Sequence, residues 1–154
     1  MASATETVNT FMQELEAKEY NRAAKYLSES LIFIGFTPRP LTKEQFVTMM
    51  EGLTGGFPNL TYNVHDVKEV DDTLEGKRVR ATVHIAGTQV DNFILPPLGL
   101  APIPQTGRSI SLPEESWEYL IRDDAISTIR VDRVPGGGIE GLLRQLGIDD
   151  PIIQ

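Results

Sequence analysis

Cysteine is absent from this 154-residue sequence, which excludes disulfide bonds and thiol catalysis. A chain without thiols fits a reducing compartment, so we expect a cytoplasmic protein. No apolar run approaches the roughly 18 residues that a membrane-spanning helix needs. Residues 1–6 show neither the basic nor the apolar segment of a signal peptide. These absences predict a protein with no membrane partner.

Basic residues are scarce. The 14 Lys and Arg residues are outnumbered by 22 Asp and Glu residues, which gives a net charge of -8. An acidic chain repels phosphate backbones, and no run of Lys or Arg relieves this, so we expect no nucleic-acid partner. Two histidines without cysteines form no recognisable ligand set, so no metal site is predicted. The length and the 40% hydrophobic content fit one globular domain spanning residues 1–154.

Apolar residues at helical spacing predict several helices. The first two are expected from Ser3 to about Leu15 and over residues 20–27. A third starts after Thr42, and a short last one covers residues 139–146 with Gly147 as its stop. Ser3 with Glu6, and Thr42 with Gln45, have the spacing of capping boxes.

Strand-like segments fill most of the remaining chain. The apolar run 31–36 predicts a strand covered on both faces. Alternating residues predict strands over 62–69 and 78–88 with a polar turn at 71–77, and two further strands over 114–122 and 125–134. Helices come first and a meandering sheet follows, which is typical of the α+β class.

Two segments break this pattern. Residues 92–104 contain four prolines and predict a stiff loop with an apolar surface, packed on its own domain or on a dimer partner, or acting as a pocket lid. Residues 136–141 match G-x-G-x-x-G. A dinucleotide site also needs a βαβ unit and an acidic residue about 20 positions further on. The sequence given reaches only Gln154, so we expect a sharp turn and no bound cofactor.

Four short motifs, in order along the chain, carry a family resemblance. They are Thr54-Gly55-Gly56-Phe57-Pro58-Asn59-Leu60, Gly87-Thr88, Pro104-Gln105-Thr106-Gly107-Arg108 and Leu142-Leu143-Arg144-Gln145-Leu146-Gly147. With the order of elements, they make the chain similar to the SnoaL-like polyketide cyclase branch of the nuclear-transport-factor-2-like (NTF2-like) superfamily. The resemblance implies an NTF2-like cone, in which N-terminal helices pack on a curved, mainly antiparallel sheet and enclose an apolar pocket. It also implies a homodimer.

The resemblance further implies acid–base catalysis without a metal or organic cofactor, in which a carboxylate of the last strand moves protons during an aldol closure. Counting from the turn at Asp124 places Val131 where that carboxylate belongs, with Asp132 one residue later. A slip of one residue moves a strand side chain to the opposite face, and only a bulge or a shifted turn would bring Asp132 back. The family's Gly-Thr-His is also changed, because Gln89 replaces the histidine.

Asp132 and His84 are the predicted catalytic residues. Inside an apolar pocket, desolvation would raise the pKa of Asp132 and make it a useful base. The alternative is a solvated Asp132 paired with Arg130 or Arg133. His84 titrates near neutral pH and would assist, unless it is a structural or dimer-facing histidine. His65 is a weaker candidate because both faces of its strand are mixed.

The predicted substrate walls are aromatic and apolar. Trp117 and Tyr119 share one strand face with Glu115 and Ile121, so they can stack on a planar ligand while the Tyr119 hydroxyl offers a hydrogen bond. Further predicted wall residues are Phe33, Phe46 and Met50. Trp117 and Tyr119 have an alternative interpretation as core or dimer-interface residues. For Phe33, Phe46 and Met50 the alternative is core packing.

These residues support three hypotheses about function. The first is a cyclase or isomerase that acts on a hydrophobic, carbonyl-bearing small molecule. The second is a non-catalytic ligand-binding module or dimeric scaffold of the same fold. The third is an epoxide hydrolase in which Arg130 and Asp132 activate water.

Overall fold

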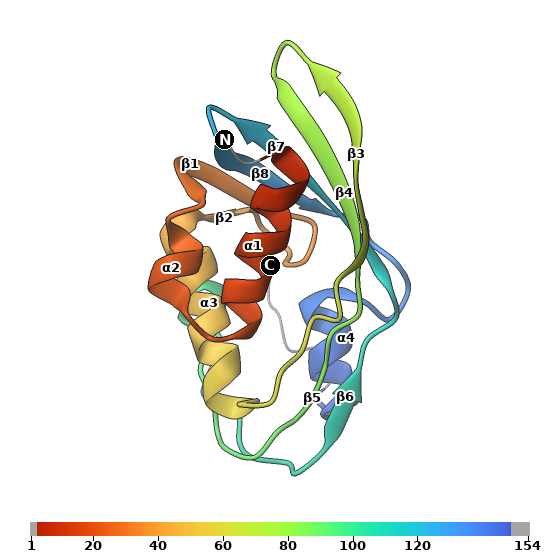
Figure 1. Cartoon of the computed structure of the whole chain (residues 1–154). Coiled ribbons are helices and arrows are strands. Elements are labelled where there is room, and N and C mark those ends of the chain that lie inside the picture. The colour runs from red at the N-terminus through yellow and green to blue at the C-terminus, as the bar shows by residue number, and fades with distance from the viewer. Residues whose placement is uncertain (1–2, 149–154) are drawn as a thin grey trace.

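A computed structural model describes residues 3–148 of the protein, and Figure 1 shows their arrangement. The elements are α1 (Ala4–Glu16), α2 (Tyr20–Ala24), β1 (Leu27–Ile34), β2 (Leu41–Thr42), α3 (Lys43–Gly56), β3 (His65–Thr73), β4 (Gly76–Val83), β5 (Ala86–Thr88), the 3-10 helix η1 (Pro96–Leu98), β6 (Ser109–Ser111), β7 (Glu115–Arg122), β8 (Ala125–Val131) and α4 (Gly138–Gln145). The predicted domain 1–154 extends beyond the described residues at both ends. None of the helices in residues 3–148 is long and apolar enough to cross a membrane.

Six strands form one mixed sheet in the order β2-β1-β8-β7-β4-β3. Only β1 and β8 pair in parallel, and the other neighbouring strands of this sheet are antiparallel. Strands β5 and β6 form a separate antiparallel pair. The predicted class, an α+β cone with a mainly antiparallel sheet, is confirmed.

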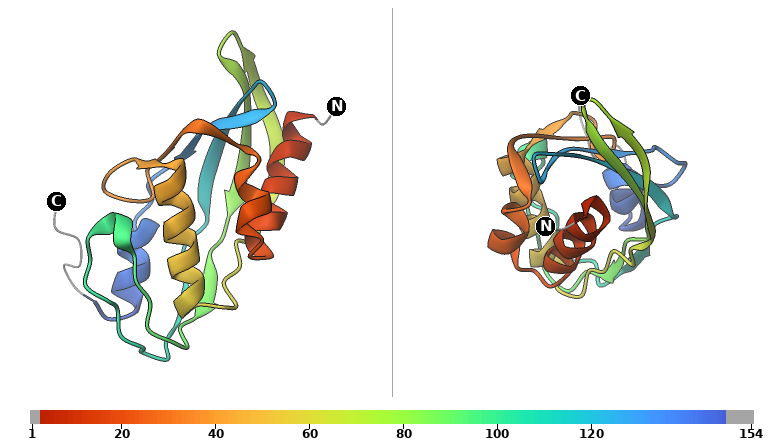
Figure 2. Two further views of the ribbon diagram at one scale, coloured as in Figure 1. Left: turned by 90° about the vertical axis from the view of Figure 1, so that its left-hand side faces the viewer. Right: turned by 45° about the horizontal axis from the view of Figure 1, so that its top comes forward.

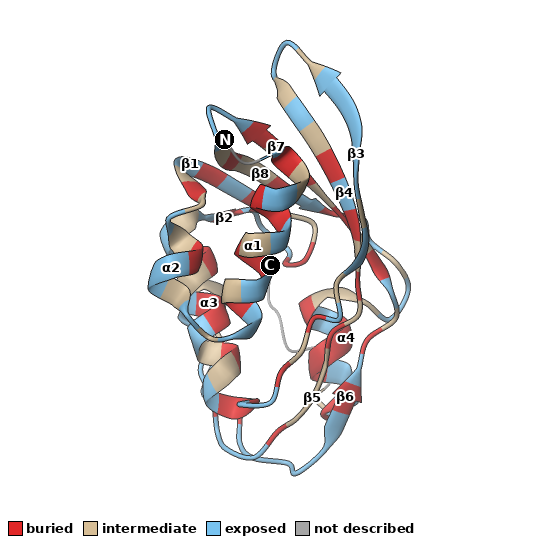
Figure 3. Ribbon diagram, viewed as in Figure 1, coloured by how far each residue is buried: buried red, intermediate tan, exposed pale blue. Residues whose placement is uncertain are grey.

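The strands curl around α1, as the end-on view in Figure 2 shows. Buried residues alternate with half-buried or exposed ones along β1, β4, β7 and β8 (Figure 3), so one side of the sheet is buried and the other is more open to solvent. The prediction that residues 31–36 are covered on both faces is therefore wrong. Leu31 and Phe33 are fully buried, but Ile32 between them is 42% exposed. Its face of β1 lies on the outer side, where alternating strand residues meet solvent.

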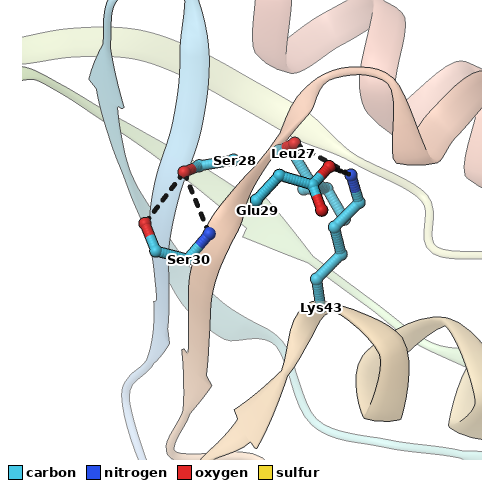
Figure 4. A network of polar contacts seen from close by, with 5 residues as sticks. All are labelled: Leu27, Ser28, Glu29, Ser30 and Lys43. Carbon is cyan, nitrogen blue, oxygen red and sulfur yellow. Dashed lines mark hydrogen bonds and ion pairs between the residues drawn. The ribbon is translucent and has the colours of Figure 1, made fainter.

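The second helix is shorter than predicted, because the chain turns into β1 at Leu27. The register between β1 and β8 shifts between Leu27 and Ile32, which marks a bulge. Figure 4 shows the polar contacts there: the Ser28 hydroxyl accepts from the Ser30 amide, and Lys43 of α3 forms a 2.8 Å ion pair with Glu29. Lys43 also donates to the Leu27 carbonyl at 3.3 Å.

The predicted polar turn at 71–77 is mostly strand. Thr73 pairs with Gly76, so the turn consists of Leu74 and Glu75 alone. The hairpin of β3 and β4 projects beyond the body of the sheet (Figure 1), and its polar residues pair through their backbones without needing burial. The predicted strand 78–88 is interrupted after Val83, because β5 leaves the main sheet to pair with β6.

Both predicted capping boxes are present, since Ser3 and Glu6 exchange hydrogen bonds at the start of α1, as Thr42 and Gln45 do at the start of α3. The proline-rich segment 92–104 packs on its own domain, which is one of the three arrangements that the sequence left open. Gly52 and Gly56 of α3 allow this contact, because a Cβ atom at Gly52 would lie 2.1 Å from the Ile94 carbonyl oxygen and one at Gly56 2.5 Å from the Phe93 ring.

Candidate functional site

The inner face of β7 carries the strongest candidate site. Residues along this strand alternate between buried and partly exposed, which turns Glu115, Trp117, Tyr119 and Ile121 toward the helices. The strand lies between β4 and β8 near the middle of the sheet. Glu115 is the one acidic residue of this otherwise apolar and aromatic row, and its residue exposure is only 2%.

Aromatic rings surround Trp117. Its ring centroid lies 5.7 Å from that of Phe33, 6.2 Å from that of Phe36 and 6.4 Å from that of Tyr119. Phe46 extends the cluster, because its centroid is 4.7 Å from that of Phe33. Such tilted and edge-on arrangements are favourable between aromatic rings.

Met50, the fifth predicted wall residue, is also buried in this core, where its sulfur accepts from the Tyr62 hydroxyl at 3.4 Å. The structure thus buries all five predicted wall residues in one interior: Phe33, Phe46, Met50, Trp117 and Tyr119.

The five predicted wall residues are packed into the interior of the fold. All five are fully buried, and none lines any of four hollows described for residues 3–148. The largest of the four has a volume of about 540 Å³ and lies between the start of α1, the β3–β4 hairpin and the β7–β8 turn. Ile121 forms part of its wall, so this hollow meets the end of the inner row of β7.

Three buried polar atoms on the inner face of β7 have no hydrogen-bond partner within the described structure. They are Oε1 of Glu115, Nε1 of Trp117 and the hydroxyl of Tyr119. A buried polar atom without a partner costs roughly 1–3 kcal/mol, so native proteins keep the number of such atoms small. Burial raises the pKa of Tyr119, which keeps this phenol protonated at neutral pH. The row therefore offers one acceptor and two donors to a bound molecule.

The Glu115 carboxylate is anchored at one oxygen and free at the other. Its Oε2 accepts a 2.8 Å hydrogen bond from the Gly138 amide, at the start of α4. Burial raises the pKa of Glu115 above its ordinary value of 4.5, and this effect outweighs the opposing influence of the Gly138 amide and the Trp117 indole. The indole lies near the carboxylate without forming a hydrogen bond of normal geometry, since both Nε1 and Oε1 lack a partner.

This raised pKa gives stability a defined pH dependence. Below pH 4.5 Glu115 is protonated in both the folded and the unfolded chain. As the pH rises above 4.5, the unfolded chain ionises first, so the folded state loses stability until the pH passes its own raised pKa.

Glu115→Gln removes this loss, and the melting temperature of the variant relative to the wild type should therefore increase between pH 4 and pH 8. We expect the difference to widen steadily with pH, because only the wild type carries the buried ionisable carboxyl group. Thermal unfolding at several pH values measures it. Asp132→Asn, which removes an exposed carboxylate, is the control and should show no such trend. A constant difference between Glu115→Gln and wild type would contradict the predicted ionisation.

The two predicted catalytic residues lie away from this interior. Asp132 is exposed and follows the end of β8, while Val131 takes the buried position beside Trp117, its partner across the strands. No bulge returns Asp132 to the inner face. Arg130 is exposed two residues earlier on the same outer side. A catalytic role for Asp132 remains a prediction that its position in the structure does not favour.

His84 is half-buried just after β4, between the buried residues Val83 and Ile85. Its Nε2 lies 2.8 Å from the Ser111 hydroxyl. His65 is exposed and forms a 3.3 Å ion pair with Glu114. Neither histidine contacts the aromatic cluster through any described hydrogen bond. No group of three or more His, Asp or Glu residues in positions 3–148 is placed to hold a metal ion.

Sequence reasoning placed Glu115 on the same strand face as Trp117 but did not assign it a role. Glu115 is the one acidic residue in an alternating row of apolar residues, and this pattern could have singled it out. Burying a carboxylate costs free energy, so its place in a buried row calls for an explanation. The family resemblance predicts the carboxylate in the last strand instead.

Comparisons with known proteins agree with the fold. No family model and no curated protein sequence matches the chain. Solved structures do match: a candidate polyketide cyclase from Xanthomonas campestris is 14% identical, with a TM-score of 0.68 over 93% of this chain and 96% of that one. A candidate SnoaL-like polyketide cyclase from Jannaschia sp. is 18% identical, with a TM-score of 0.63 over 85% of this chain and 88% of that one.

An NTF2-like protein of unknown function from Cytophaga hutchinsonii is 19% identical, with a TM-score of 0.57 over 88% of this chain and 94% of that one. At sequence identities this low, the structural similarity establishes the fold and leaves the activity open. The chain thus has the NTF2-like fold, in the form found in SnoaL-like structures.

Proposed function

We propose that this protein is an acid–base enzyme for an apolar, carbonyl-bearing small molecule, with Glu115 as its proton carrier. The observation that carries the proposal is a buried carboxylate with one free oxygen, in a row with two buried donors that also lack partners. A base with a raised pKa holds its proton more strongly, which brings it closer to the range useful at neutral pH. Candidate polyketide cyclases among the structural neighbours are consistent with a carbonyl substrate.

The proposed chemistry is an enolisation. Oε1 of Glu115 removes a proton from the carbon next to the carbonyl group. The electron pair of the broken C–H bond forms a C=C bond, and the π pair of the C=O bond moves onto the carbonyl oxygen. The Trp117 N–H and the Tyr119 O–H donate hydrogen bonds to the developing oxyanion. The protonated Glu115 then returns its proton, either to another carbon in an isomerisation or to the alkoxide formed when the enolate closes a ring. Atoms and charge balance without another reactant.

A ligand must displace packed side chains to reach this row. Tyr119 lies two residues before Ile121 on the same face of β7, and Ile121 lines the 540 Å³ hollow. We therefore place the entrance at this end of the sheet, between α1 and the β7–β8 turn.

The test uses 2-tetralone, an apolar ketone with acidic C–H bonds, in deuterated buffer. Proton NMR follows the exchange of these hydrogens, and the fluorescence of Trp117, the single tryptophan of the chain, reports binding. Tetralin, which has the same carbon skeleton without the carbonyl, is the matched control ligand. Exchange faster than in buffer, with a fluorescence change for the ketone only, supports the proposal. Absence of both effects for 2-tetralone would contradict it.

The rival function is a binding module without catalysis. The outward position of Asp132 favours it. Binding of ketones and tetralin alike, without accelerated exchange, would identify this function. Epoxide hydrolysis finds less support, because Arg130 and Asp132 both lie on the exposed side of the sheet.

We also propose a homodimer formed through the outer face of the sheet. This face carries the 42% exposed Ile32 and the half-buried Leu120, with the exposed Arg130 across from Glu118. Sedimentation velocity should show a dimer at about 50 µM protein, a concentration suited to moderate affinity. Ile32→Glu places a charge in the exposed apolar part of this face and should shift the protein toward monomer. A monomeric wild type would contradict the pairing.

A further inference from the structure

The glycine-rich segment before α4 forms the sharp turn that its sequence predicts. Gly136 and Gly138 have φ angles of +82° and +69°, in the left-handed region where glycine is favoured. Gly141 allows a close approach, since a Cβ atom there would lie 2.0 Å from the Gly136 carbonyl oxygen. Backbone geometry therefore explains these three glycines as parts of a tight turn into the helix.

Gly137 is different. Its φ of -95° and ψ of -173° describe an extended backbone that any residue can adopt. A Cβ atom at this position would nevertheless lie 2.7 Å from Oε2 of Glu115 and 2.9 Å from a methyl group of Val134. The carboxylate thus rests against bare backbone, where the next amide, that of Gly138, donates to it at 2.8 Å.

We infer that Gly137 is a positioning residue for Glu115: its missing side chain lets the carboxylate dock on the first amide of α4, which fixes Oε2 and leaves Oε1 free. The docking itself is independent of any substrate. Its catalytic meaning rests on the proposed function, in which Oε1 carries the proton.

The electrostatic setting supports this role. The start of a helix favours a negative charge, so the docked carboxylate is partly compensated for its burial. Charged groups on the neighbouring segments are Glu114 just before β7, His84 after β4, Arg133 after β8 and Glu140 in α4. Three of them are exposed and His84 is half-buried. No charged side chain contributes to the shifted pKa of Glu115, which reflects burial, the Gly138 amide and the Trp117 indole.

The experiment replaces Gly137 with alanine and follows Trp117 fluorescence against pH. Glu115 is close enough to the indole for its ionisation to change the emission, and Glu115→Gln should abolish that transition. In Gly137→Ala the carboxylate is pushed off the Gly138 amide, so the midpoint should move up by about one pH unit. Gly55→Ala in α3 is the matched control, because a Cβ atom there meets nothing within 4 Å, and its midpoint should equal that of wild type.

A second measurement separates positioning from general damage to the turn. The Gly137→Ala substitution is introduced into the wild type and into Glu115→Ala. It should lower the melting temperature clearly more in the wild-type background, because Glu115→Ala lacks the carboxylate with which the new Cβ atom clashes. If Gly137→Ala alone is insoluble, recovery of soluble protein in the Glu115→Ala background is the expected result. The inference would be overturned if the fluorescence midpoint of Gly137→Ala were unchanged or if the melting temperature fell equally in both backgrounds. It would also be overturned if an insoluble Gly137→Ala protein did not become soluble in the Glu115→Ala background. Neither readout involves a substrate, so a failed exchange test would disprove the proposed function and leave this docking intact.

Discussion

Glu115→Gln is expected to slow 2-tetralone exchange by a factor of about 100 to 10,000, the usual contribution of a positioned proton carrier. Glutamine has nearly the same shape and its amide oxygen can still accept from the Gly138 amide, but it cannot take up a proton. Binding of the ketone, read from Trp117 fluorescence, should change only a few-fold because both donors remain. The loss should therefore appear in the rate of the chemical step.

Asp132→Asn is the matched control for this variant. It also neutralises one carboxylate, but on the exposed side of the sheet, beyond the end of β8. Its exchange rate should stay within about two-fold of wild type, as for a surface substitution without buried contacts. The opposite result, with Asp132→Asn inactive and Glu115→Gln active, would move the catalytic centre to the outer face and restore the family's last-strand carboxylate.

The alternation of residues along β7 was sufficient to predict its inner face. Trp117 and Tyr119 are buried together as expected, because side chains of a strand point to opposite faces in turn. The same rule, applied from Asp124, placed Val131 inward and Asp132 outward, and the structure agrees. Choosing Asp132 as a catalytic residue required a bulge that the strand does not have at that point.

Other features depend on contacts that a local pattern cannot contain. The early start of β1 involves a bulge whose Glu29 pairs with Lys43 in another element. The break after Val83 is hidden, because Val83 and Ile85 are both buried and the alternation continues while the chain changes sheets. The anchoring of Glu115 on Gly138 joins residues 23 positions apart. Each is a product of tertiary packing.

Gln89 shows how a departure from a family pattern can be structural. It stands where the resemblance predicts a histidine, yet it is fully buried with both ends of its amide bonded. Its Nε2 donates to the carbonyls of Asp91 and Pro104 at 3.0 and 2.8 Å. Its Oε1 accepts from the amide and the hydroxyl of Thr106 at 3.0 and 2.6 Å. These four bonds tie both ends of the proline-rich segment together.

Gln89→Leu should therefore be among the most destabilising single changes in the chain. Leucine fits the volume but leaves two carbonyls and the Thr106 amide without this partner, and each such group that stays buried costs roughly 1–3 kcal/mol. We expect a loss of about 3 kcal/mol in the free energy of unfolding, measured by urea denaturation. Gln105→Leu is the control. The Gln105 side chain is exposed, and it is the backbone amide of Gln105 that donates to Asn92. The stability of this variant should therefore stay within about 0.5 kcal/mol of wild type. Equal stability of the two variants would mean that the segment 92–104 is held by its apolar contacts with α3 instead of by Gln89.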